Sequence, residues 1–314
     1  MKIMRINLMA MLCASRQIKH SHEGRSVKKV LVGCRATSGL MFALCLAFSA
    51  YADAINIWTY TGADGNGAGV NSASAGAGSL TTTGAYATNI GANGLTGNWA
   101  TNTTGSPSAA LLFFAGAGLG MVSDGSGPPN EAIDNNGTYT EGILLNFSVS
   151  TILTGIDLGL VSGDADVSVF RFVGASPPTL SGTGANLSAM NTAGWSLVGN
   201  YANLSQDSTS PFAWNLINGA TDSDPTSGVT PTASASSVGS TWWLVSAYNM
   251  GFGTGTNLSQ GDDYFKVLAV AGADCTGTVS QCAGTSSTTV PEPATLALLG
   301  FGLAGIGFAR RKSH

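Results

Sequence analysis

Short runs of apolar and β-branched residues alternate with polar, glycine-rich segments along most of the chain. The connecting segments carry Pro-Pro, Asp-Gly, Asn-Gly and Ser-Gly turn signals, and no amphipathic helix of ordinary length separates them. This pattern predicts an antiparallel β-sandwich, jelly-roll-like and with Gly-rich loops, whose core would include Phe170, Trp195, Trp214 and Trp242. The predicted strands are residues 54–60, 80–90, 110–115, 143–149, 155–161, 166–173, 195–199, 241–248 and 264–270.

The hydrophobic pattern also divides the chain into three parts. Residues 1–52 form an N-terminal extension and signal segment, 53–289 form the β domain, and 290–314 form a C-terminal segment. Small residues dominate 53–107, so we expect that stretch of the domain to be rich in loops.

The N-terminal part contains a pattern typical of a secretory signal at residues 28–52. Basic residues precede an eleven-residue apolar run at 40–50, which is too short to span a bilayer as a helix. The small residues Ala50 and Ala52 then frame a cleavage site before Asp53. A cleaved signal helix implies export through the Sec translocon and cutting by signal peptidase.

Charged residues are sparse in the body, and nearly all of them are acidic. Of the 13 Lys and Arg, eight lie in residues 1–35 and three in 310–312, which leaves only Arg171 and Lys266 against 15 Asp and Glu between residues 53 and 290. Such an acidic domain cannot neutralise a phosphate backbone, so nucleic-acid binding is excluded. All three histidines lie in the terminal segments, which excludes histidine-dependent catalysis and His-ligated zinc in the body.

The C-terminal part has a proline-flanked motif, a short apolar run and a basic stop. Sixteen apolar residues reach about 24 Å as a helix, so a membrane anchor with a cytoplasmic basic tail is the plain interpretation. The three parts are Val290-Pro291-Glu292-Pro293, residues 294–309, and Arg310-Arg311-Lys312.

This arrangement resembles the PEP-CTERM sorting signal of Gram-negative bacteria, whose recognition motif is the Pro-Glu-Pro. The resemblance implies a transmembrane helix at 294–309, processing by an exosortase and loss of the hydrophobic tail. It further implies a transient inner-membrane anchor, followed by release to the cell surface or extracellular matrix.

Residues 116–174 carry a second resemblance, to the exosortase-dependent surface proteins, a family of unknown molecular activity. The similarity lies in Gly116-Ala117-Gly118-Leu119-Gly120, Ile133-Asp134-Asn135, Gly155-Ile156-Asp157-Leu158-Gly159 and Asp164-Ala165-Asp166. It implies a host that makes exopolysaccharide and a role in envelope, matrix or biofilm, and it provides no catalytic residues.

The cysteines predict one local disulfide. Cys13, Cys34 and Cys45 lie in segments that we expect to be removed, which leaves Cys275 and Cys282 in an oxidising compartment. A metal site is the alternative, but too few Cys and His remain to complete four ligands.

Carboxylates are the remaining catalytic candidates. Three pairs lie close in sequence and could in principle serve acid–base chemistry across a cleft, as in glycosidases. Solvated turn positions explain them more simply, so we expect no enzyme. The pairs are Asp164 with Asp166, Asp222 with Asp224, and Asp262 with Asp263.

Two weaker binding hypotheses remain. Asp134, Asp222 and Asp224 lie in Asp- and Asn-rich turns that could hold calcium, although turn chemistry alone favours the same residues, so we expect no cofactor. Trp243 is the candidate sugar contact, since one member of the Trp242–Trp243 pair should point away from the core, but burial of both is the alternative. The sequence thus predicts a structural or adhesive surface protein, with binding of the host exopolysaccharide as the alternative.

Overall fold

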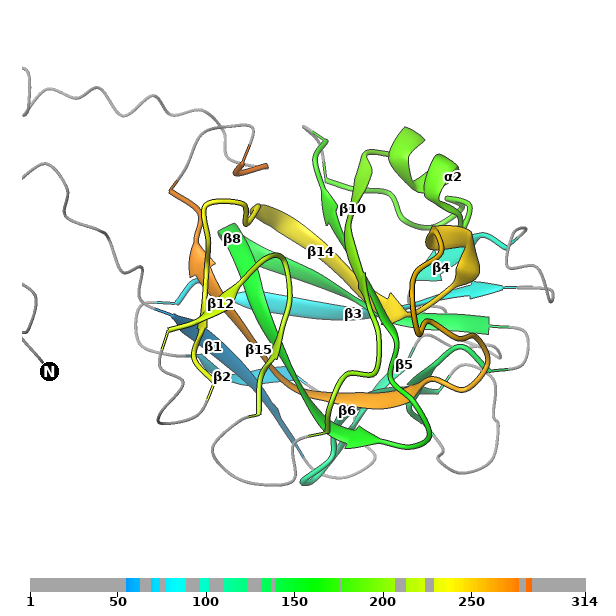
Figure 1. Ribbon diagram of the computed structural model, residues 1–314, viewed down its shortest axis with the longest axis horizontal. Coiled ribbons are helices and arrows are strands. Elements are labelled where there is room, and N and C mark those ends of the chain that lie inside the picture. Colours follow the sequence, from blue (N-terminus) through cyan, green and yellow to red (C-terminus); the bar gives the residue numbers. More distant parts are fainter. Residues whose placement is uncertain are drawn as a thin grey trace, which may run out of the picture. The chain divides into compact units, whose positions relative to one another are not determined.

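Strands make up nearly all of the regular structure in the computed structural model (Figure 1). All the residues it describes belong to one unit, Asp53–His314. The predicted signal at 28–52 and the apolar run at 294–309 lie outside these residues, and within them no helix is long and apolar enough to cross a membrane. The structure describes residues 55–62, 69–73, 77–88, 97–101, 110–122, 131–136, 139–174, 177–206, 213–223, 229–276 and 281–283.

Fifteen strands and two short helices are present in these ranges. The strands are β1 (Asn56–Thr61), β2 (Gly69–Ala73), β3 (Leu80–Thr88), β4 (Trp99–Thr101), β5 (Ala110–Phe114), β6 (Gly118–Val122), β7 (Ile133–Asp134), β8 (Tyr139–Val161), β9 (Val167–Phe172), β10 (Trp195–Tyr201), β11 (Asn215–Leu216), β12 (Thr221–Asp222), β13 (Pro231–Thr232), β14 (Ser240–Ala247) and β15 (Tyr264–Asp274). The helices are α2 (Leu187–Thr192) and the 3-10 helix η1 (Met250–Phe252).

The 23-residue strand β8 organises the sheet. Its first half lies between β3 and β14, and its second half lies between β11 and β15. Through β8, thirteen strands form one hydrogen-bonded sheet with the central order β10-β9-β14-β8-β15-β1-β2, while β12 and β13 form a separate hairpin. All pairings between named strands are antiparallel.

The main core is a cluster of buried side chains that come from one face of each half of this sheet. In β9, for example, Val167 and Val169 join this cluster, whereas Phe170 and Phe172 join a second cluster on the opposite face. This division follows the two-residue period of a strand. The main cluster draws its large side chains from β1, β8, β14 and β15, including Trp58, Phe147, Trp243 and Phe265.

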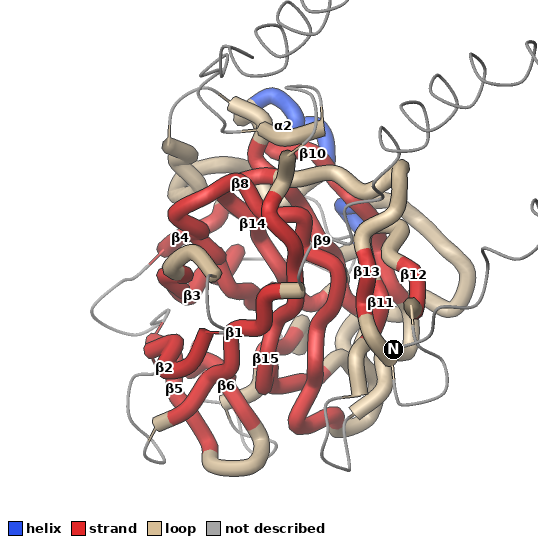
Figure 2. The backbone as a smooth tube through the Cα atoms, turned by 90° about the vertical axis from the view of Figure 1, so that its left-hand side faces the viewer, coloured by secondary structure: helices blue, strands red, loops and turns tan. Residues whose placement is uncertain are grey.

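Helix α2 and η1 supply part of the second cluster, and α2 lies beside β10 (Figure 2). The helix begins where the Asn186 side chain accepts a hydrogen bond from the Ala189 N–H. It presents Met190 to the core, and the chain then reverses at Gly194, whose φ is +89°. Two short helices therefore cover part of the second cluster.

The prediction of a mostly β, antiparallel fold is confirmed, but this strand order does not show a jelly roll. The predicted strands at 143–149 and 155–161 are parts of the single strand β8, because the polar residues between them remain extended. The described residues of the segment 53–107 hold four strands and bury Trp58, Tyr60 and Trp99. The prediction that this segment is rich in loops also concerns residues outside the described ranges, so it stays a prediction.

Candidate functional site

Three carboxylates from two distant parts of the chain meet at one end of the sheet. Asp164 follows β8, Asp166 precedes β9 and Asp263 precedes β15, and their oxygens lie within 4.8 Å of one another. Gly163, with φ at +86°, allows the tight reversal after β8. A parallel bridge between Asp164 and Asp263 then brings the two loops together.

Backbone N–H groups occupy much of this acidic cluster. Asp166 accepts hydrogen bonds from the N–H groups of Asn203, at 2.8 Å, and Ser259, at 2.6 Å. Asp263 accepts one from the N–H of Asp166, at 2.5 Å, and another from the side-chain amide of Asn135. The carboxylates therefore tie together four loops that are remote in sequence.

Burial favours the protonated form of Asp166 and Asp263. Removal from water, opposed by the N–H bond from Asp166 and reinforced by the neighbouring charges of Asp166, Asp164 and Asp262, raises the pKa of Asp263 to about 8. Burial likewise raises the pKa of Asp166, partly offset by the N–H groups of Ser259 and Asn203. Near neutral pH, Asp263 therefore keeps a proton in a large fraction of folded molecules.

Burial also limits the chemistry of the cluster. Asp166 and Asp263 have 0% of their surface exposed, so a substrate cannot reach them in this conformation. The three carboxylates are close enough to share one cation, but their oxygens already accept hydrogen bonds from the protein. This arrangement suits a structural junction between loops better than a catalytic pair.

Of the sequence-predicted calcium residues, the structure describes Asp134 and Asp222, and each makes a turn contact of its own. The carboxylate of Asp134 accepts the N–H of Asn136, and that of Asp222 accepts the N–H of Thr230 in the β12–β13 hairpin. Neither belongs to the acidic cluster, and Asp224 lies outside the described residues. Asp134 and Asp222 therefore have the turn contacts that explain their residue type without a metal.

The sugar contact expected at Trp243 is not available. Trp243 has 0% of its surface exposed, and its indole N–H lies 3.1 Å from the Thr151 carbonyl and 3.0 Å from the Ser240 carbonyl. Its neighbour Trp242 is half-buried against the second core cluster. The period of the strand does separate the two rings, but neither projects fully into solvent.

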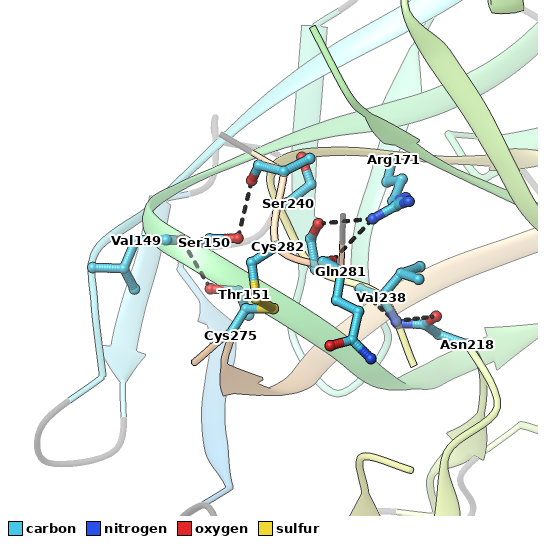
Figure 3. Close-up of a disulfide and its surroundings, with 12 residues drawn as sticks. Val149, Ser150, Thr151, Arg171, Asn218, Val238, Ser240, Cys275, Gln281 and Cys282 are labelled. Atoms are coloured by element: carbon cyan, nitrogen blue, oxygen red, sulfur yellow. Dashed lines mark hydrogen bonds between the residues drawn. A yellow bond between two sulfur atoms is a disulfide. The ribbon is translucent and has the colours of Figure 1, made fainter. Parts of the chain in front are cut away.

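The predicted disulfide between Cys275 and Cys282 is present, with the two Cα atoms 5.5 Å apart (Figure 3). It holds residues 281–283 against Gly239, which donates to the Gln281 carbonyl at 2.6 Å and accepts from the Ala283 N–H at 2.9 Å. A side chain at position 239 would clash with the sulfur of Cys275, so glycine is required there.

Two further groups hold this segment, and sequence reasoning assigned a role to neither of them. Ser150 donates to the Ala283 carbonyl at 3.0 Å. The Nη1 of Arg171 donates to the carbonyls of Gln281, at 3.0 Å, and Gly239, at 3.3 Å (Figure 3). A lone arginine in an otherwise apolar strand was the available signal.

The comparisons with known proteins concern the C-terminal segment. The family model for the PEP-CTERM protein-sorting motif matches residues 289–312. No curated protein and no solved structure matches the chain.

The matched segment lies outside the described residues, as do the predicted cleavage residues Ala50, Ala52 and Asp53. It contains all the predicted sorting residues, from Val290 through Pro291, Glu292 and Pro293 to Arg310, Arg311 and Lys312. The chain therefore carries a PEP-CTERM sorting signal and is an exported protein that an exosortase sorts.

Proposed function

We propose that the chain is a surface or extracellular-matrix protein with a structural or adhesive role in a Gram-negative envelope or biofilm. The sorting motif at 289–312 carries this proposal, because it directs the β domain out of the cell. The anchored segment at 281–283 supports it, since a disulfide and Arg171 fasten the last described residues before the motif.

We further propose that the β domain is not an enzyme and needs no cofactor. In the acidic cluster, Asp166 and Asp263 are buried away from substrate and Asp164 is half-buried, and the domain has no histidine. Hydrogen bonds from backbone N–H groups partly neutralise these carboxylates without a cation.

The test is to map both termini by mass spectrometry on protein from the native host. We expect a start at Asp53, a new C-terminus near residues 291–293, and loss of Arg310, Arg311 and Lys312. An intact tail in fully exported protein would contradict processing and leave a plain membrane anchor.

A variant pair sharpens this test. Replacing Pro291 and Pro293 by Ala should leave the tail uncut and hold the protein in the membrane fraction. Ser286→Ala, which lies just before the matched segment, should be processed like the wild type. Equal processing of both variants would show that Pro291 and Pro293 are not needed for processing, which would contradict the proposal.

Binding to the host exopolysaccharide is the second candidate function. It cannot use Trp243, but one observation still favours it. A polar cavity of about 280 Å³ opens beside Arg171, and it is large enough for a small ligand.

A further inference from the structure

The cavity lies where the main core reaches the β10 edge of the sheet. Strand β9 contributes Arg171, strand β10 contributes one wall, and the segments before β14 and after β11 contribute the other. Figure 3 shows Arg171, Val238 and Asn218 on the same side of the disulfide. The lining residues are Arg171, Ser196, Leu197, Val198, Asn218, Gly219, Ser236 and Val238.

Arg171 gives this cavity a positive charge, which is rare in the domain. The only other cation between residues 53 and 309 is Lys266, whose Nζ lies 3.3 Å from the centre of the Phe114 ring and whose side chain is buried. Among the described residues, the cavity is therefore the one place where an anionic ligand would meet a cationic side chain that is not buried.

The guanidinium is held in place before any ligand arrives. Arg171 follows Val167 and Val169 on the inner face of β9, and in register it lies between Ser196 of β10 and Trp243 of β14. Its Nη1 is fixed by two neutral carbonyls, and partial burial lowers its pKa. A half-desolvated, oriented guanidinium gains more from a carboxylate than a solvated one does.

The remaining lining combines hydroxyl and apolar groups. The Ser196 hydroxyl makes no hydrogen bond among the described residues, and Ser236 is exposed. The amide of Asn218 is already used, because it donates to the carbonyls of Leu153 and Val238. Leu197 and Val198 complete a mixed surface of the kind that small-molecule sites use.

We propose that this cavity binds a sugar carrying a carboxylate, such as one uronate residue, with Arg171 pairing to the carboxylate and Ser196 bonding a ring hydroxyl. Its volume of about 280 Å³ lies just below the range of ligand cavities, about 300 to 1,000 Å³, so it fits one residue. The biological meaning of this site rests on the proposed export, whereas the binding itself does not.

The test is an NMR titration of the full chain in detergent, labelled with ¹⁵N-arginine. The Nε–Hε signal of Arg171 is identified by its loss in Arg171→Lys. We expect a saturable shift with glucuronate and none with glucose at equal concentration. Acetate tests for a free carboxylate, and binding of acetate as tight as that of glucuronate would overturn the sugar assignment.

Changing Arg171 could disturb the structure as well as the binding, because its side chain also bonds the Gln281 carbonyl. A variant that blocks the cavity instead avoids this problem. Ser196→Phe fills the cavity and leaves the Arg171 contacts to the two carbonyls intact, so glucuronate should bind at least tenfold more weakly. Ser188→Phe, on the exposed face of α2, is the matched control and should bind like the wild type. Unchanged binding in Ser196→Phe, or equal shifts with glucose and glucuronate, would overturn the proposal.

Discussion

Two buried serines on β14 differ in the hydrogen bonds that their hydroxyl groups make. Ser240 donates to the Phe172 carbonyl at 2.7 Å and accepts from the Trp242 N–H at 3.0 Å. Ser246 has the same 0% exposure, but its hydroxyl has no partner among the described residues. A buried hydroxyl without a partner costs about 1–3 kcal/mol in desolvation.

These contacts predict opposite effects for the same substitution. Ser246→Ala should raise the free energy of unfolding by about 1 kcal/mol, whereas Ser240→Ala should lower it by about 1–3 kcal/mol. Urea unfolding of both variants measures this, and a loss of stability in Ser246→Ala would show that its hydroxyl is satisfied.

Asp263 predicts a pH dependence of stability. Its pKa of about 8 in the folded state exceeds the value of about 3.9 in an unfolded chain, so between these values the folded protein holds the extra proton. The contribution of Asp263 to the free energy of unfolding should therefore be fully present below about pH 4 and be lost as the pH rises toward 8.

Urea unfolding near pH 5 and pH 8 measures this slope. Asp263→Asn should flatten it, while Asp222→Asn in the β12–β13 hairpin should leave it unchanged. A slope that persists in Asp263→Asn would assign it to other acids of the cluster, such as Asp166.

At the scale of elements, two glycines of the β5–β6 hairpin have different structural roles. Gly116 has φ at +76° and open space around its Cα, so it supplies only turn geometry. A Cβ on Gly120 would lie 1.7 Å from the Glu131 carbonyl oxygen, so this glycine allows two backbones to touch.

Alanine substitution should distinguish these two roles. Gly116→Ala should cost about 1–2 kcal/mol, the penalty for a left-handed backbone. Gly120→Ala should exceed the roughly 3 kcal/mol of ordinary substitutions, because backbone must move. Melting temperatures of the two variants measure the difference, and similar losses would contradict the close packing of β6.

The disulfide-closed element predicts a measurable stabilisation. For so short a loop, breaking the bond between Cys275 and Cys282 should cost about 2–3 kcal/mol. Urea unfolding with and without dithiothreitol measures it. A variant with both cysteines changed to Ser should not respond to the reductant, and a response there would point to the other three cysteines.

At the scale of the whole domain, β8 makes the two halves of the sheet interdependent. The main core takes side chains from both halves, and β15 bonds to the second half of β8 along most of its length. Neither half can therefore open without exposing the core of the other.

This arrangement predicts a single unfolding transition. Far-UV circular dichroism and tryptophan fluorescence should give the same urea midpoint, because Trp58 and Trp243 report on the main core while Trp99 and Trp195 report on the second. Separate midpoints would show that one half unfolds alone.

Apolar runs bounded by turn signals predicted eight of the fifteen strands that the structure describes, but not their connection. The strands that were missed have two to five residues each, and they are β2, β4, β6, β7, β11, β12 and β13. The apolar periods of β9, β14 and β15 are visible in the sequence, whereas the continuity of β8 across residues 150–154 depends on pairing with β15. Likewise, Asp164 and Asp166 were identifiable as a pair, but Asp263 joins them only through a bridge across 99 residues of chain. Long-range register of this kind has no local signal.

The pairing of β1 with β15 also sets an order of events during synthesis. Asn56 is made 216 residues before its partner Gly272, so the sheet cannot close until the chain has passed the end of β15 at Asp274. Pro291 of the sorting motif follows only 17 residues later. A chain that stops short of β15 therefore lacks both a closed sheet and the sorting signal.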